Sequence, residues 1–461
     1  MNKKIIVVCT SLMIAFSGVA FSGETPVSPD KGLKYPDYIA KPGDLVVSRT
    51  DYADRLEGFW LGQCIANFTG LTTEGARRTA PFYTDEDWGN YRGRADRGER
   101  KGERIEFVLV EEESAWGADD DTDIEYIFQS ILNRNNVSVA TPQMIRNGWL
   151  KHIKTEEPNA LWVSNEAALK LMVKGMRPPE TSLPRNNKHY DQIDAQLTTE
   201  IFGLFAPARP DIALKMAHMP IRTTAYRDAE WIAEFYVIMH SLAASVDSSL
   251  SMQEQTVWLA GQARKRVPDQ SFAAKMYEFV KAEYEKNPDK DNWEKTRDAL
   301  HVKYQVNGDD GYPYKTYFDA GINFGASIVS LFYGEGDYRR TIQIGSLCGW
   351  DSDNPTATWG GLLGFMLGRK GVEDAFPEKK ISGLYHIGRT RINFPDRTPN
   401  QPGDDSFDRM AVRGIHVIDR VVIEEMGGGV NLEKDLWYLP NPGSTFAKAK
   451  YLKGKPQPLA K

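Results

Sequence analysis

Cysteine is scarce in this sequence of 461 residues, with three in all. None of them forms a Cys-x-x-Cys pair, and the seven histidines show neither His-x-His nor His-Glu-x-x-His spacing. Zinc sites built from thiolate or imidazole ligands need such spacings, so the sequence argues against a zinc site. The scarcity of cysteine also excludes a small domain stapled by disulfides. Cys64 and Cys348 suit either a disulfide or two buried thiols.

An excess of positive charge is also lacking, because 57 Lys and Arg residues stand against 63 Asp and Glu residues. A net charge of −6 offers no basic stripe, so we expect no nucleic-acid partner. After the N-terminus no apolar run approaches membrane length, so the processed chain is expected to have no membrane span. With 41% hydrophobic and 26% charged residues, the composition is that of a globular protein.

The first 22 residues have the pattern of a signal peptide. Lys3 and Lys4 precede the apolar stretch IIVVCTSLMIAF, and small residues such as Ala20 and Ser22 then offer cleavage sites. The apolar stretch is shorter than the ~20 residues that a membrane span needs. We therefore expect an exported bacterial protein that is periplasmic or secreted.

The rest of the chain predicts one helical domain between two less regular ends. Residues 23–50 are rich in proline and polar side chains and predict a linker or arm. Residues 51–375 contain a succession of amphipathic helices, and residues 376–461 form a C-terminal extension with mixed patterns. Residues 105–110, IEFVLV, predict a strand. The predicted fold class is mostly all-α, with small peripheral strands.

Two segments carry small residues at every fourth position. The first stripe consists of Gly58, Gly62, Ala66 and Gly70, and the second of Gly360, Gly364 and Gly368. Four-residue spacing places such residues on one face of a helix. Glycine inside a helix costs ~1 kcal/mol relative to alanine, so a stripe of this kind indicates close packing against another element.

The first of two acidic motifs is a run of three aspartates. Asp119, Asp120 and Asp121 stand at the predicted start of a helix, where the helix dipole stabilises an anion by only ~0.3–1 kcal/mol. Three neighbouring carboxylates in a partly buried setting repel one another unless a cation lies among them. The alternative is an acidic helix start that faces solvent.

The second acidic motif lies far along the chain, directly before the second glycine-striped helix. Asp351 and Asp353 alternate on a loop and are followed by Asn354. Carboxylate and amide oxygens form a ligand set suited to magnesium, manganese or calcium. The spacing does not follow the twelve-residue EF-hand loop. Two aspartate clusters, each at the start of a helix, are able to come together in the fold and form one site for two cations.

These residues resemble the ADP-ribosylglycohydrolase family. The segment Asp119-Asp120-Asp121-Thr122 is similar to the family's Thr-Asp-Asp-Thr segment, and residues 349–354, GWDSDN, are similar to its Gly-Gly-Asp-Thr-Asp-Thr segment. A third family element, a glycine-rich first helix that ends in a glutamate, is similar to GQCIANFTGLTTE, which ends at Glu74. The three elements occur in the family's order, and the resemblance covers roughly residues 54–370.

Three positions depart from the family's pattern. Asp119 replaces the first threonine, Asn354 replaces the last one, and Asn67 replaces an aspartate of the first helix. The amide carbonyl of Asn354 is still able to ligate a cation. These departures bear on metal preference and on the substrate.

The resemblance implies an all-helical fold around two divalent cations, with Mg²⁺ expected and Mn²⁺ or Ca²⁺ as alternatives. It implies hydrolysis of an N- or O-glycosidic bond at the anomeric carbon of a ribosyl or ADP-ribosyl group, in a small molecule or a protein. The implied metal ligands are Asp119, Asp120, Asp121, Asp351, Asp353 and Asn354. The implied catalytic carboxylate is Glu74, with Asp120 as second choice. The implied substrate-binding residues are Asn67, Gly349, Trp350 and Ser352.

Other functions remain open at this point. An exported enzyme meets nucleosides and glycans as well as modified proteins, so a furanoside or nucleoside hydrolase with the same fold is one alternative. A non-catalytic protein that binds a ribosyl ligand is another, because a fold does not fix a function. A two-metal phosphate-ester hydrolase is less favoured because the motifs lack histidine ligands. For Glu74 the alternative is an ordinary surface glutamate.

Overall fold

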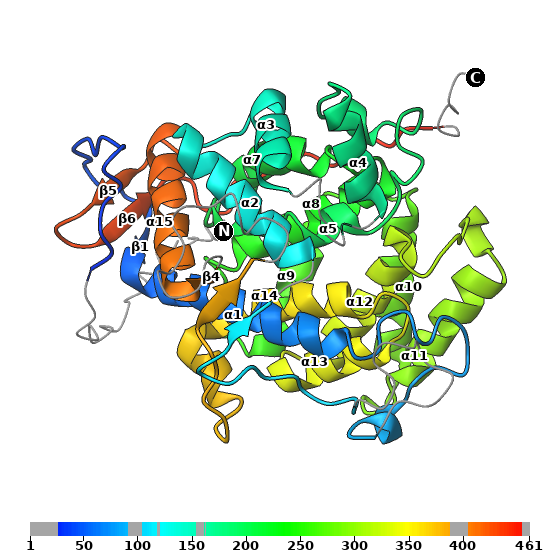
Figure 1. Cartoon of the computed structure of the whole chain (residues 1–461). Coiled ribbons are helices and arrows are strands. Elements are labelled where there is room, and N and C mark those ends of the chain that lie inside the picture. The colour runs from blue at the N-terminus through cyan, green and yellow to red at the C-terminus, as the bar shows by residue number, and fades with distance from the viewer. Residues whose placement is uncertain are drawn as a thin grey trace, which may run out of the picture.

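The structure is a computed structural model, and Figure 1 shows a body of packed helices with small strands at its edge. It describes residues 26–90, 104–117, 120–153, 161, 163–387 and 404–453. The predicted signal peptide and Asp119 lie outside the described residues. In the described part of the chain, no helix combines the length and the apolar character that a membrane crossing requires.

Helices form most of the described chain. They are α1 (Arg49–Gly70), α2 (Asp120–Asn135), α3 (Pro142–His152), α4 (Val163–Val173), α5 (Asp194–Leu197), α6 (Ile201–Leu204), α7 (Pro210–Ile221), α8 (Asp228–Leu242), α9 (Met252–Arg264), α10 (Phe272–Lys286), α11 (Glu294–Leu300), α12 (Ala320–Tyr333), α13 (Tyr338–Leu347), α14 (Asp353–Asp374) and α15 (Phe407–Glu424). The strands are β1 (Leu45–Ser48), β2 (Ala115–Trp116), β3 (Leu384–His386), β4 (Asp404–Ser406), β5 (Gly429–Asn431) and β6 (Leu436–Leu439). The predicted fold, mostly α-helical with small peripheral strands, is confirmed.

The two glycine stripes pack against each other. A Cβ atom on Gly62 of α1 would lie 2.3 Å from the carbonyl oxygen of Gly360 in α14, and one on Gly364 would lie 2.2 Å from the carbonyl oxygen of Gly58. Real side chains do not approach backbone atoms so closely, so only glycine allows the two helices to pack at this separation. The predicted close packing is confirmed, and its partner is the second stripe.

This packing brings the end of α1 to the start of α14. A Cβ atom on Gly70, the last residue of α1, would lie 2.4 Å from the Cα atom of Asp353, the first residue of α14. The glycine-rich first helix and the second acidic motif are therefore held side by side by backbone contact.

The strands form two three-stranded sheets. In one, β6 lies between β1 and β5 and pairs antiparallel with both. In the other, β3 pairs parallel with β2 and antiparallel with β4. The strand predicted at residues 105–110 is wrong, because this segment has no ladder partner. Its apolar side chains serve packing instead, as Phe107 does between Trp88 and Phe376.

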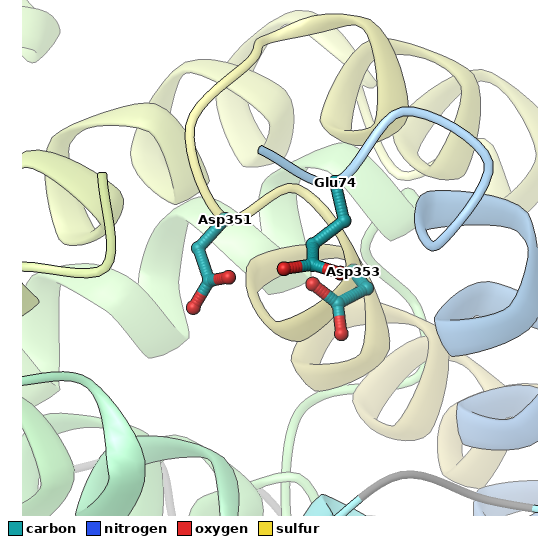
Figure 2. Close-up of side chains that lie close together, drawn as sticks. All are labelled: Glu74, Asp351 and Asp353. Carbon is teal, nitrogen blue, oxygen red and sulfur yellow. The ribbon is translucent and has the colours of Figure 1, made fainter. Parts of the chain in front are cut away.

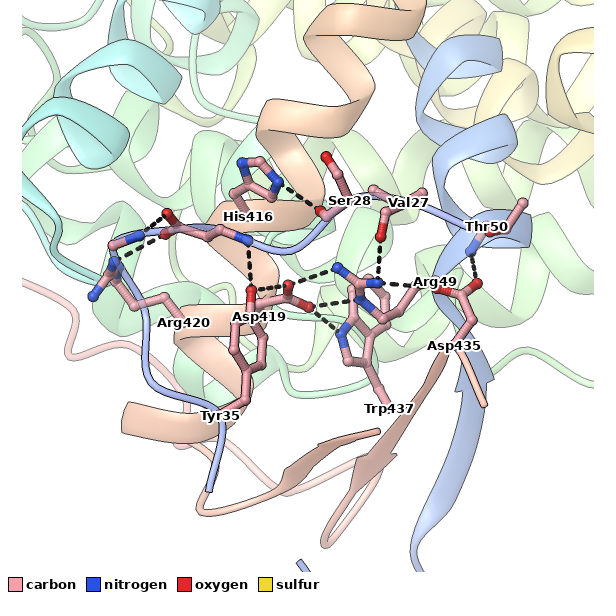
Figure 3. A network of polar contacts seen from close by, with 12 residues as sticks. Val27, Ser28, Tyr35, Arg49, Thr50, His416, Asp419, Arg420, Asp435 and Trp437 are labelled. Carbon is pink, nitrogen blue, oxygen red and sulfur yellow. Dashed lines mark hydrogen bonds and ion pairs between the residues drawn. The ribbon is translucent and has the colours of Figure 1, made fainter. Parts of the chain in front are cut away.

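A buried polar network ties both ends of the described chain to the start of α1 (Figure 3). Arg49 of α1 donates to Asp419 of α15 at 2.8 and 3.0 Å and to Asp435 at 3.0 Å. Tyr35 donates to Asp419 at 2.9 Å, and Trp437 donates to it at 2.7 Å. Burial and the Asp419 carboxylate raise the pKa of the Tyr35 hydroxyl. The predicted arm and the predicted C-terminal extension thus pack against the helical body.

Cys64 and Cys348 are both buried and free in the structure. Burial raises the pKa of both thiols, that of Cys348 to about 12. Of the two roles that the sequence allowed, the structure shows two packed thiols.

Candidate active site

The end of α1 and the starts of α2 and α14 meet at one place in the fold. The side-chain amide of Asn67, on α1, donates to Asp121 Oδ2 of α2 at 2.9 Å and lies 3.5 Å from Asp353 Oδ2 of α14. All three side chains are buried. One amide group therefore links the two acidic motifs, which stand far apart in the sequence.

Three carboxylates of this region converge on one point. Oxygen atoms of Glu74, Asp351 and Asp353 all lie within 4.8 Å of one another. Figure 2 shows that Glu74 comes from the loop after α1, whereas Asp351 and Asp353 come from the turn that begins α14. Asp351 and Asp353 are 5% and 1% exposed, and Glu74 is half-buried. The Tyr317 hydroxyl donates to Glu74 Oε1 at 3.2 Å.

The convergence is electrostatically costly for the protein alone. Two unit charges 4.8 Å apart repel by about 3.5 kcal/mol at an effective dielectric constant of ~20. A cation or a bound proton relieves this repulsion. Because all the donor atoms are hard oxygens, the group fits Mg²⁺, Mn²⁺ or Ca²⁺ better than a thiophilic metal.

A small cavity of about 10 Å³ lies beside this acidic group. Both acidic motifs contribute to its lining, Asp120 from the first and Asp351 and Asn354 from the second. The remaining lining residues are Ile193, Asp194, Leu197 and Phe318. The cavity therefore has carboxylates and an amide among apolar side chains.

Two amide side chains fix carboxylates on the wall of this cavity. Asn165 of α4 donates to Asp120 Oδ2 at 3.1 Å, and Asn354 donates to Asp351 Oδ2 at 3.0 Å. The Oδ1 atom of Asn354 is buried and accepts no hydrogen bond from the residues that the structure describes. A buried carbonyl oxygen without a partner costs ~1–3 kcal/mol, which a ligated cation would offset. This orphaned oxygen supports the predicted ligand role of Asn354.

The turn that carries the two aspartates is tightly packed. Gly349 has φ +93°, and a Cβ atom there would lie 2.6 Å from the ring of Phe82. The Trp350 ring is fully buried and its indole N–H donates to Gln305 at 2.7 Å. The Ser352 hydroxyl lies 2.9 Å from the Thr73 hydroxyl. These contacts fix the turn that presents Asp351 and Asp353, and a contact of Gly349, Trp350 or Ser352 with a substrate stays a prediction.

Two buried glutamates lie near the first acidic motif. Glu125 is one helical turn beyond Asp121 on α2, and Glu200 directly precedes α6. Glu125 accepts the backbone N–H of Ile201 at 2.8 Å, and Glu200 accepts the Thr358 hydroxyl at 2.7 Å. Burial raises the pKa of both carboxyls, that of Glu200 to about 7. The pair therefore holds a proton near neutral pH, which limits the negative charge packed around the acidic motifs.

Three polar residues of the site fall outside the predicted set: Asn165, Asp194 and Tyr317. Asp194 stands in QIDAQL and Tyr317 in KTYFDAG, and neither segment has metal-ligand spacing or resembles a catalytic motif. Their roles follow from tertiary contacts alone, because α5 and the segment before α12 line the cavity from distant parts of the chain and α4 contacts Asp120. For these three residues the sequence offers no signal.

Most of the chain is similar to a known protein family. The family model described as ADP-ribosylglycohydrolase matches residues 48–403 of the chain. A search of curated proteins finds no match. A solved structure titled "ADP-ribosylglycohydrolase-related protein complex" is similar with a TM-score of 0.41 and 14% identity, over 80% of this chain and 99% of that one.

Proposed function

The chain belongs to the ADP-ribosylglycohydrolase family, and on that premise we propose that it is a metal-dependent hydrolase of ribosyl glycosides. It cleaves an N- or O-glycosidic bond at the anomeric carbon of a ribosyl or ADP-ribosyl group. One observation carries the proposal: Asn67 links the two acidic motifs, and both motifs line one cavity. As an exported protein it would act in the periplasm or outside the cell.

The acidic groups around the cavity are the proposed cation ligands. Asp351, Asp353 and Asn354 from the start of α14, and Asp120 and Asp121 from the start of α2, would hold two divalent cations, with Mg²⁺ expected. Glu74 lies among the carboxylates of this group, so it would contribute an oxygen as well. When bound, such cations supply Lewis acidity toward sugar oxygens and toward water.

The chain's own residues bind and orient the substrate. Phe318 and Leu197 are apolar side chains beside the acidic motifs, and they would contact the C–H face of a sugar. The amide of Asn165 fixes the carboxylate of Asp120, another lining residue. Cleavage at an anomeric carbon develops positive charge on the sugar, which a carboxylate nearby stabilises.

Glu74 and Asp120 are the two carboxylates proposed for this catalytic role. Asp120 lines the cavity, and Glu74 is oriented by the Tyr317 hydroxyl beside Asp351 and Asp353. A positioned acid–base group contributes typically ~10²–10⁴ in rate. Replacing the catalytic carboxylate by its amide should therefore reduce turnover within that range.

A product screen tests the proposed function. The full chain is incubated with an ADP-ribosylated protein, ADP-ribosyl small molecules, nucleosides and aryl furanosides, after chelation and with added Mg²⁺ or Mn²⁺. The expected result is metal-dependent release of free ribose or ADP-ribose, detected by mass spectrometry. Cleavage of nucleosides or aryl furanosides alone would remove the ADP-ribosyl substrate from the proposal. Release of phosphate in place of a sugar would contradict the reaction class.

A further inference from the structure

Trp350, which directly precedes Asp351, has a backbone conformation that a bulky residue rarely adopts. Its φ is +56°, in the left-handed region that favours glycine. Such a conformation persists only where the surrounding contacts fix it, and it is found most often at functional sites. The contacts of Trp350 therefore show what determines the position of Asp351.

The backbone of Trp350 is bound to the loop that carries Glu74. The Gly75 N–H donates to the Trp350 carbonyl at 2.7 Å, and the Trp350 N–H donates to the Arg77 carbonyl at 2.9 Å. Gly75 directly follows Glu74, and Trp350 directly precedes Asp351. The two segments that present the three carboxylates of Figure 2 are thus paired through their backbones, next to the carboxylates themselves.

Gln305 connects the same two segments through its side chain, which is half-buried. Its Oε1 atom accepts the indole N–H of Trp350 at 2.7 Å, and its Nε2 atom donates to the Arg78 carbonyl at 2.8 Å. One amide group therefore holds Trp350 with its acceptor and the loop after Glu74 with its donor.

Gln305 stands on a π-helix, His301–Val306, which directly continues α11. A π-helix closes its hydrogen bonds over one residue more than an α-helix, is rare, and often occurs at functional sites. The His301 ring of the same π-helix packs against the rings of Phe82 and Trp350, with centroid distances of 5.1 and 6.3 Å. This short element thus supplies both a ring contact and a hydrogen bond to Trp350.

We propose that Gln305 is a positioning residue of the cation site. It would act through the turn of Trp350 and the loop of Glu74, and not as a cation ligand. By holding these two segments together, its amide fixes how closely Glu74 approaches Asp351 and Asp353. The inference rests on the proposed function, because it concerns carboxylates that are assigned there to the cations.

A role of Gln305 in stability alone makes a different prediction. If its two hydrogen bonds only stabilise the fold, their loss lowers the thermal midpoint but leaves the cation affinity of the folded protein unchanged. If Gln305 positions Glu74, their loss lowers that affinity. The contribution of Glu74 to cation binding then falls as well, because its carboxylate is no longer held beside the aspartates.

Calorimetric titration with Mn²⁺ separates the two roles. The full chain is titrated below its thermal midpoint as the wild type, as Gln305→Met, as Glu74→Gln and as the double variant. Methionine has about the length of glutamine and makes neither hydrogen bond. The matched control is Gln255→Met, because Gln255 is half-buried on α9 and its amide donates to the Leu250 carbonyl at 2.8 Å, outside the acidic group. Gln305→Asn, whose reach is one methylene group shorter, replaces Gln305→Met if that variant does not fold.

The expected result is a coupled loss of affinity. Gln305→Met should raise the Kd for Mn²⁺ by about 10-fold, as the loss of a residue that orients metal ligands does. The factor by which Glu74→Gln raises the Kd should be at least about threefold smaller in the Gln305→Met background than in the wild type. Gln255→Met should bind Mn²⁺ within about twofold of the wild type.

Two outcomes would overturn the role of Gln305 and leave the proposed function standing. They are a Kd for Gln305→Met within about twofold of the wild type, and effects of Gln305→Met and Glu74→Gln that multiply independently. If the wild type itself binds no Mn²⁺, the cation site of the proposed function fails and this inference fails with it.

Discussion

Replacing Asp353 by asparagine should stabilise the metal-free protein and reduce the stabilisation that a divalent cation provides. In the metal-free protein Asp353 repels both Glu74 and Asp351, since the three carboxylates lie within 4.8 Å of one another. The variant removes one charge and keeps the volume, so two of the three repulsive pairs disappear. With a divalent cation present, the same charge is attractive and its loss weakens binding.

The size of both effects follows from the geometry. Each repulsive pair contributes about 3.5 kcal/mol at an effective dielectric constant of ~20. A carboxyl of ordinary pKa can also take up a proton, at a cost of about 4 kcal/mol at pH 7. Because protonation relieves the same repulsion, this cost is the upper limit of the stabilisation that the substitution can bring. We therefore expect Asp353→Asn to stabilise the metal-free protein by roughly 1–4 kcal/mol. A cation at a free concentration of about 100 times its Kd for the wild type should stabilise the wild type by about 2.7 kcal/mol. The same concentration should stabilise the variant by much less, because the variant binds the cation more weakly.

Urea unfolding in EDTA and in Mg²⁺ measures both quantities. The matched control is Asp374→Asn, at the other end of α14, where the side chain is 63% exposed and pairs with Lys370. This control should change the free energy of unfolding by less than about 0.5 kcal/mol, with or without metal. If Asp353→Asn is less stable than the wild type by the same amount in EDTA and in Mg²⁺, Asp353 is an ordinary structural residue and the metal site is refuted.

Three further changes test other parts of the structure. Glu200 has its pKa raised to about 7 in the folded state, so the contribution of this carboxyl to wild-type stability should fall by roughly 3 kcal/mol as pH rises from ~4.5 through ~7. In Glu200→Gln, unfolding at pH 5 and pH 8 should show a smaller fall, and equal falls would contradict the buried-proton assignment. Tyr317→Phe removes the hydroxyl that orients Glu74 and should weaken Mn²⁺ binding by roughly 3–10-fold in calorimetry; unchanged affinity would remove Tyr317 from the site. Gly62→Ala should lower the thermal midpoint because its Cβ would lie 2.3 Å from a carbonyl oxygen of α14, whereas Gly261→Ala, with open space around it, should not.

The sequence predicts the helical fold and the elements that build the site. Helical periodicity is a local property, and four-residue spacing of glycines marks a close helix contact wherever its partner lies. The partner of Gly62 was not predictable from its own segment, yet the second stripe around Gly364 carries the matching spacing. The three acidic and glycine-rich motifs could be assembled because they resemble those of a known family in the same order.

The parts that the sequence does not predict depend on tertiary contacts. Asn67 was expected to bind the substrate, and the structure shows in addition that its amide links Asp121 and Asp353. Residues 105–110 have the composition of a strand, but their apolar side chains pack into the helical body without a ladder partner. Asp194 reaches the cavity from a short helix whose sequence pattern resembles ordinary core packing.

Turnover by verified metal-free protein tests the central claim most directly. A substrate that the product screen identifies is incubated with protein whose divalent metal content has been removed by chelation and checked by mass spectrometry, and Mg²⁺ or Mn²⁺ is then added back. If the acidic motifs form a cation site for glycoside hydrolysis, release of the sugar should stop on chelation and return on addition of either metal. Full turnover by the metal-free protein would contradict this account.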